Sequence, residues 1–94
     1  MPITPKFIIA NVTASNGVVL GSETNPQTIR LLVTRSVYIV FDQANVSAAN
    51  SALAANPLLL SPGHNILFQN CNLSTTWVRS QDATASNVSY YYGA

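Results

Sequence analysis

Short apolar segments recur along the whole chain, and clusters of Gly, Pro, Asn and Ser separate them. This pattern is typical of antiparallel β-structure, because each apolar segment suits one strand and each cluster suits a turn. The predicted strands are Lys6–Thr13, Gly17–Leu20, Thr28–Thr34, Val37–Phe41, Pro57–Leu60, Asn65–Gln69, Thr75–Arg79 and Asn87–Tyr92. The clear alternation in the two central strands predicts a core made of Ile29, Leu31, Val33, Val37, Ile39 and Phe41.

The segment Gln43–Asn56 breaks this pattern, since it shows neither alternation nor turn chemistry. Its alanines favour a helix, Ser47 is suited to cap that helix, and Pro57 stops it from running further. We expect a short helix or an ordered loop here, crossing from one sheet to the other.

A tight turn is predicted at Ser61–Asn65, because Pro62 suits the second position of a turn and Gly63 can adopt the positive φ that follows. Short strands joined by turns and one longer crossover favour a sandwich over a closed barrel. The sequence therefore predicts an all-β fold, namely a β-sandwich or compact jelly roll of about eight short antiparallel strands.

The length of 94 residues predicts a single domain over residues 1–94, because half of such a chain is too small to bury its own core. Pro2 and Pro5 mark residues 1–6 as an extended N-terminal arm, which either frays or reaches onto a neighbouring subunit. The segment Phe7–Val12 is apolar on both faces. We expect a strand there that is buried or covered by a neighbour.

Charged residues are scarce: they make up 7% of the chain, and the formal net charge is +1. This balance removes the usual electrostatic attraction to nucleic acid and to membrane surfaces, so we expect neither as a partner. A surface built mainly from Asn, Ser, Thr and Gln also has little charge to keep copies apart. We expect much of it to be covered by copies of the chain or by a larger assembly, with an unusual monomer as the alternative.

The chain offers few groups for catalysis, with one His, one Cys and three acids. His64 lies next to a turn and is expected to be solvated. Cys71 has no neighbouring Lys to lower its pKa, which indicates an inert thiol. No His and Cys cluster has the spacing of metal ligands. We therefore expect a protein that is not an enzyme and that uses no metal or cofactor.

Two of the three acids have an arginine nearby in the sequence, which favours ion pairing over a pair of catalytic carboxylates. The expected ion pairs are Arg35 with Asp42 and Arg79 with Asp82.

Aromatic residues are the main remaining resource for binding. Trp77 shares a strand face with Arg79, and Tyr90–Tyr92 forms an aromatic run near the C-terminus. Such residues are enriched at protein interfaces, although Trp77 and Tyr90 would equally suit the core with Tyr91 outside. A carbohydrate-binding face built on these rings is a further alternative.

The stretch Arg30–Phe41, the small-residue loop after it and the turn Leu58–Gly63 resemble a family of small β-sandwich virion proteins of tailed bacteriophages. The similarity continues through the strand at Ile66–Gln69 and through Val78–Thr84. It implies a cement or decoration protein on the capsid exterior, often a homotrimer, with a major capsid protein as its partner. The Leu58–Ser61 form of the turn departs from the family pattern, so a tail or head-completion protein remains an alternative.

The expected function is thus structural: the protein binds the capsid surface of the virion and stabilises the lattice. The first residues carry no basic segment followed by an apolar run, so we expect synthesis in the host cytoplasm. A free-standing, lectin-like binding module is the alternative. The predicted interface residues are Met1, Pro2, Ile3, Pro5, Phe7, Val46, Leu53, Trp77 and Tyr91.

Overall fold

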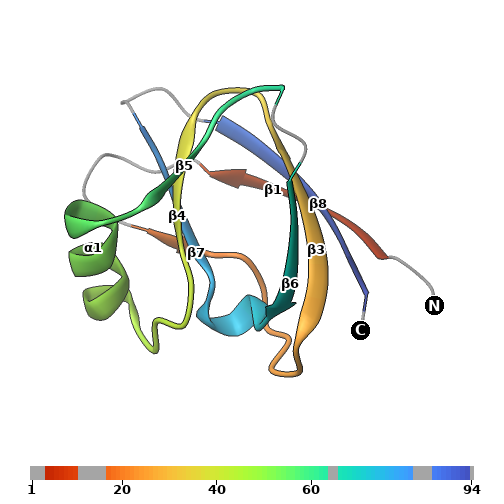
Figure 1. Ribbon diagram of the computed structural model, residues 1–94, viewed down its shortest axis with the longest axis horizontal. Helices are drawn as coiled ribbons and strands as arrows, with labels where there is room; N and C mark the ends of the chain where they lie inside the picture. Colours follow the sequence, from red (N-terminus) through yellow and green to blue (C-terminus); the bar gives the residue numbers. More distant parts are fainter. Residues whose placement is uncertain (1–3, 11–16, 64–65, 82–85, 94) are drawn as a thin grey trace.

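Two four-stranded antiparallel sheets build the computed structural model, which describes residues 4–10, 17–63, 66–81 and 86–93 (Figure 1). In spatial order, the first sheet contains β1 (Thr4–Ala10), β8 (Ser86–Gly93), β3 (Gln27–Val33) and β6 (Ile66–Cys71). The second contains β2 (Val18–Val19), β7 (Trp77–Ser80), β4 (Val37–Val40) and β5 (Leu58–Leu60). The predicted all-β sandwich is confirmed, and each predicted strand overlaps an observed one.

The strand pairing has a nested order. The pairs β1–β8, β2–β7, β3–β6 and β4–β5 are all antiparallel, as if the chain were one long hairpin. This hairpin is rolled up, so that β3 also pairs with β8 and β4 also pairs with β7. Eight strands arranged in this way form a jelly roll. The sheets end at β1 and β6 and at β2 and β5, respectively.

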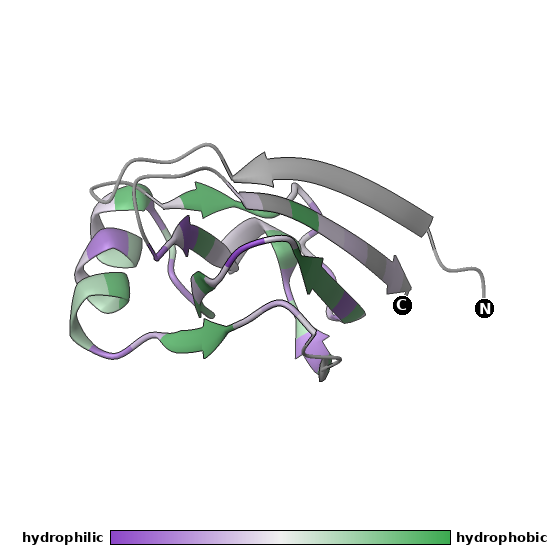
Figure 2. Cartoon of the chain, turned by 90° about the horizontal axis from the view of Figure 1, so that it is seen from above, coloured by the Kyte–Doolittle hydropathy of each residue, from purple (hydrophilic) through white to green (hydrophobic). Residues whose placement is uncertain are grey.

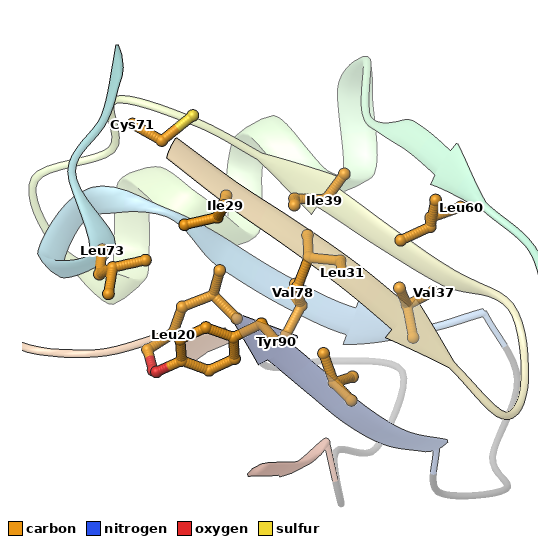
Figure 3. Packing of buried hydrophobic residues seen from close by; sticks show 11 residues of the cluster. Leu20, Ile29, Leu31, Val37, Ile39, Leu60, Cys71, Leu73, Val78 and Tyr90 are labelled. Atoms are coloured by element: carbon orange, nitrogen blue, oxygen red, sulfur yellow. The ribbon is translucent and has the colours of Figure 1, made fainter. Parts of the chain in front are cut away.

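The core lies between the two sheets and is filled from the inward faces of their strands, together with Leu20 after β2 and Leu73 in the short 3₁₀-helix Leu73–Thr75 (Figure 3). Its members are Leu20, Ile29, Leu31, Val37, Ile39, Leu60, Cys71, Leu73, Val78, Val88 and Tyr90. Four of the six predicted core residues are among them. The other two, Val33 and Phe41, are partly buried and pack against the cluster. Alternation in the central strands was therefore a reliable guide to the core.

The helix α1 (Val46–Ala55) lies within the segment Gln43–Asn56 where a short helix or ordered loop was predicted, but two expectations about it are wrong. Asn45, not Ser47, caps its N-terminus, because the Asn45 side chain accepts a hydrogen bond from the Ala48 amide at 2.9 Å. The helix joins β4 to β5, which are neighbours in the same sheet, so it does not cross between sheets.

Instead, α1 packs against β4 and β7 and buries Ala49 and Leu53. Val40 is also buried without belonging to the central cluster, since its side chain faces away from Ile39 on the strand. The helix therefore covers part of the outer face of the second sheet. Leu53, predicted at an interface, is only 1% exposed, so this side chain is occupied within the chain and the prediction is corrected.

The N-terminal segment is also more integrated than predicted. Residues Thr4–Lys6 belong to β1, where they pair with Tyr90–Tyr92 of β8, so the arm does not extend to residue 6. Pro5 and Phe7 thus lie on a paired strand. Their side chains, and Met1, Pro2 and Ile3 altogether, lie outside the described part of the chain.

The predicted turn at Ser61–Asn65 is confirmed as far as the description extends. Pro62 and Gly63 form the turn, and Gly63 has a φ of 91°. This left-handed conformation favours glycine because a Cβ atom would be strained there. His64 and Asn65 lie outside the described residues.

Candidate functional site

Two edge strands on one side of the sandwich expose leucine side chains. Strand β5 ends the second sheet and β6 ends the first, and Figure 1 shows both in front of β4 and β3. Leu58 and Leu59 on β5 are 45% and 41% exposed, and Leu67 on β6 is 50% exposed. We call these three residues the leucine flank. Figure 2 shows β5 as a hydrophobic strand at the margin of the sandwich.

The leucine flank lies within a segment that has no formal charge. No Asp, Glu, Lys or Arg occurs between Asp42 and Arg79, a segment that includes α1, β5 and β6. The nearest charge on the neighbouring strand is Arg30, which lies opposite Leu67 in the β3–β6 pair. Proteins commonly protect sheet edges with charged side chains, so an uncharged edge rich in leucine is a candidate interaction surface.

The form of these edges favours contact through side chains over extension of a sheet. Strand β5 is three residues long, and the pairing of β6 with β3 is interrupted by a register shift between Gln27 and Ile29. Short edge strands and bulges both oppose the addition of another strand. A partner on the leucine flank is therefore expected to pack against the leucines themselves.

Trp77 and Arg79 share the outer face of the second sheet, as predicted. The Arg79 guanidinium lies 5.4 Å from the centre of the Tyr38 ring, and the two residues are directly opposite on β7 and β4. Trp77 is half-buried, and its indole N–H donates a hydrogen bond to the Gln43 carbonyl at 2.9 Å. Trp77 thus stabilises the segment that leads from β4 to α1 through this hydrogen bond, and it does not belong to the central core.

Of the remaining aromatic predictions, Tyr90 is confirmed in the core, where it is 1% exposed. The side chain of Tyr91 lies outside the described residues. Val46, in the first turn of α1, is exposed and available to a partner.

The ion pair predicted between Arg35 and Asp42 is wrong. Arg35 precedes β4 by two residues and Asp42 follows it by two, so the strand separates them by roughly 20 Å at about 3.3 Å per residue. The partner predicted for Arg79, Asp82, lies outside the described residues.

A hollow of about 280 Å³ lies at the end of the sandwich where β4 and β6 finish. It is lined by Phe41, Asp42, Phe68, Gln69, Asn70, Cys71 and Thr76. The rings of Phe41 and Phe68 are tilted by 51°, with their centres 5.1 Å apart. We call this feature the end hollow.

The thiol of Cys71 in the end hollow is not suited to nucleophilic catalysis or to metal binding. Burial raises the pKa of the Cys71 thiol above its ordinary value, and the negative charge of Asp42 raises it further. The thiol therefore stays protonated near neutral pH, whereas a nucleophilic or metal-binding cysteine needs the thiolate. Within the described residues, no three His, Cys, Asp or Glu side chains gather as a metal site would require.

Comparison with protein-family models, curated proteins and solved structures gives no match. Among the described residues, no helix has the length and apolar character needed to cross a membrane. The sequence reasoning missed both the leucine flank and the end hollow. The flank had a visible signal in the uncharged run from Gln43 to Val78, whereas the hollow depends on contacts between distant strands.

Proposed function

We propose that this protein is a structural virion protein of a tailed phage that binds the capsid exterior as a cement protein, assembling through the leucine flank. The observation that carries the proposal is the exposure of Leu58 and Leu59 on the edge strand β5 and of Leu67 on the edge strand β6, within a segment of the sequence that has no charged residue. Exposed leucines on a chain with so little charge favour association, and association stabilises a lattice when several copies bridge its subunits.

The leucine flank is large enough to matter energetically. Fully burying a leucine side chain contributes about 1.5–3 kcal/mol, and each of these three is roughly half exposed. Covering all three therefore contributes about 3 kcal/mol per copy, which is roughly a hundredfold in an association constant. Val46, which is 46% exposed, is a further apolar side chain that a partner can cover.

The virion setting is supported by the resemblance of residues 30–90 to the phage family. The jelly roll is compatible with it, because viral capsid proteins use this architecture, but lectin domains use it as well. A fold alone does not select a function. The preference for the cement role over the lectin-like alternative therefore rests on the leucine flank.

The association through the flank is tested by placing charge on it. In the double variant L58K/L59K, both substituted side chains are already exposed, so the fold should persist while self-association is lost. The control is Leu32→Lys, because Leu32 has a similar exposure of 43% but lies on β3, an inner strand of the first sheet, and not on an edge strand.

Sedimentation equilibrium is the measurement. We expect the wild type and Leu32→Lys to sediment as a trimer of the 10.0 kDa chain, and the double variant as a monomer. A folded double variant with the same oligomeric mass as the wild type would remove the flank from the interface. A monomeric wild type would contradict self-association through the flank and would leave binding to the capsid as a monomer, or the binding-module alternative.

A free-standing binding module remains a second candidate because the end hollow combines aromatic rings with polar side chains. A tail or head-completion protein would use the same leucine flank with a different partner, and binding to isolated capsids separates the two.

A further inference from the structure

The end hollow has a rigid frame on its β4 side. The Gln43 amide donates to the Thr75 carbonyl at 3.0 Å, and the Gln43 side chain donates back to the Phe41 carbonyl at 3.0 Å. The Trp77 indole adds a third hydrogen bond, to the Gln43 carbonyl. These bonds fix the backbone on either side of Asp42, which has a left-handed φ of 59°.

The β6 side of the hollow is shaped by a bulge. Gln27 pairs with Cys71 and Ile29 pairs with Phe68, so Gln69 and Asn70 together face the single residue between them on β3. Asn70 has a φ of 59°, the other left-handed conformation among the described non-glycine residues. Bulges often redirect side chains beside binding sites, and here the bulged residues line the hollow.

The polar groups around the hollow define the ligand that fits. The carboxylate of Asp42 accepts hydrogen bonds only, while the amides of Gln69 and Asn70 both donate and accept. Among the described residues, no Lys or Arg lines the hollow, which disfavours an anionic ligand. A cationic ligand would leave the amide donors unused. Hydroxyl groups match the whole set, because each one donates and accepts.

The two phenylalanines supply the apolar half of the site. Their tilted rings offer an apolar surface next to the carboxylate and amide groups. A sugar ring has the matching character, with C–H groups on its faces and hydroxyls at its edge. We propose that the end hollow binds a single neutral saccharide residue, with its ring against Phe41 and Phe68 and its hydroxyls on Asp42, Gln69 and Asn70.

The volume of the end hollow limits the affinity that can be expected for a saccharide. At about 280 Å³ the hollow lies just below the usual range of small-molecule sites, which is roughly 300–1,000 Å³. One ring therefore fits, and a dissociation constant on the order of millimolar is expected, equivalent to about 4 kcal/mol. This binding is independent of the leucine flank and goes beyond the proposed assembly role.

Nuclear magnetic resonance titration tests the proposal on the full chain. The probes are methyl glycosides of glucose, galactose and mannose together with N-acetylglucosamine, and the comparison ligands are glucuronate and lysine amide. We expect at least one neutral sugar to shift the side-chain amide signals of Gln69 and Asn70 in a saturable manner. Glucuronate and lysine amide should shift them at least tenfold more weakly.

Two variants tie the binding to the hollow. Asn70→Gly suits the left-handed backbone, so it should preserve folding while it removes the amide and weakens sugar binding at least tenfold. Asp42→Asn should also weaken binding, whereas the matched control Glu23→Gln, which does not line the hollow, should not. The proposal is overturned if no neutral sugar gives a saturable shift at about 50 mM, well above millimolar affinity. Preferential binding of lysine amide or unchanged binding by folded Asn70→Gly would overturn it equally.

Discussion

The buried hydroxyl of Tyr90 is expected to hold the two sheets together at one end of the core. Tyr90 lies on β8, and its hydroxyl donates a hydrogen bond of 2.6 Å to the Leu20 carbonyl, which follows β2 in the other sheet (Figure 3). Both residues are almost fully buried. The substitution Tyr90→Phe keeps the ring and removes only this bond.

The loss of stability in Tyr90→Phe follows from the polar group that is left unpaired in the core. Without the hydroxyl, the buried Leu20 carbonyl loses its donor, and leaving a buried polar group unsatisfied costs about 1–3 kcal/mol. For a chain of this length, about 2 kcal/mol corresponds to a decrease of roughly 10 °C in melting temperature. Total stabilities are only about 5–15 kcal/mol, so the effect should be easy to measure.

The same hydroxyl predicts a dependence on alkaline pH. Burial raises the pKa of Tyr90 above its ordinary value of 10.0, with further increases from Tyr92 and Glu23. As pH rises past the unfolded pKa, the unfolded chain binds fewer protons than the folded chain, so the free energy of unfolding falls. This contribution is complete below about pH 10 and is lost as pH rises towards the folded pKa. Tyr90→Phe lacks the titration, so its difference from the wild type should narrow above about pH 10.

Urea unfolding followed by tryptophan fluorescence is the assay, with Tyr92→Phe as the control. Tyr92 is half-buried, and its ring lies 5.9 Å from that of Tyr90. We expect Tyr92→Phe to change stability by no more than about 0.5 kcal/mol. A loss below about 0.5 kcal/mol in Tyr90→Phe at neutral pH would refute the role of the hydrogen bond. A difference that stays constant through the alkaline range would refute the titration.

Two further substitutions test the packing. Phe41→Ala should lower the free energy of unfolding by about 2–3 kcal/mol. This is less than the roughly 3–5 kcal/mol of a fully buried phenylalanine, because Phe41 is only partly buried against the core. A decrease under about 1 kcal/mol in urea unfolding would show that Phe41 does not pack against the core. Leu53→Ala should cost about 2–4 kcal/mol and loosen α1, whereas the exposed Val46→Ala should have little effect on stability. If Leu53→Ala and Val46→Ala lowered the free energy of unfolding equally, the packing of α1 on the sheet would be contradicted.

Local patterns in the sequence predicted the strands and most of the core. Ile29 and Leu31, and Val37 and Ile39, are buried because alternation places every second side chain on the inward face. The range of α1 was also local information, since its alanines favour a helix. These features depend on neighbours in the sequence, which is why they could be read from it.

Features that depend on distant neighbours could not be read in this way. Alternation of apolar residues does not indicate which strands pair with each other. Thr4–Lys6 belong to β1 because they pair with β8 at the other end of the chain. The burial of Leu53 depended likewise on β4 and β7. The end hollow required the bulge at Asn70, which exists only because β6 and β3 pair with a register shift.

The cement role is tested most directly by co-sedimentation with phage capsids that lack this protein. The wild type and Leu32→Lys should pellet with the capsids and raise their resistance to heat, and L58K/L59K should remain in the supernatant while still folded. Failure of the wild-type protein to bind such capsids, or equal binding by the double variant, would contradict the account.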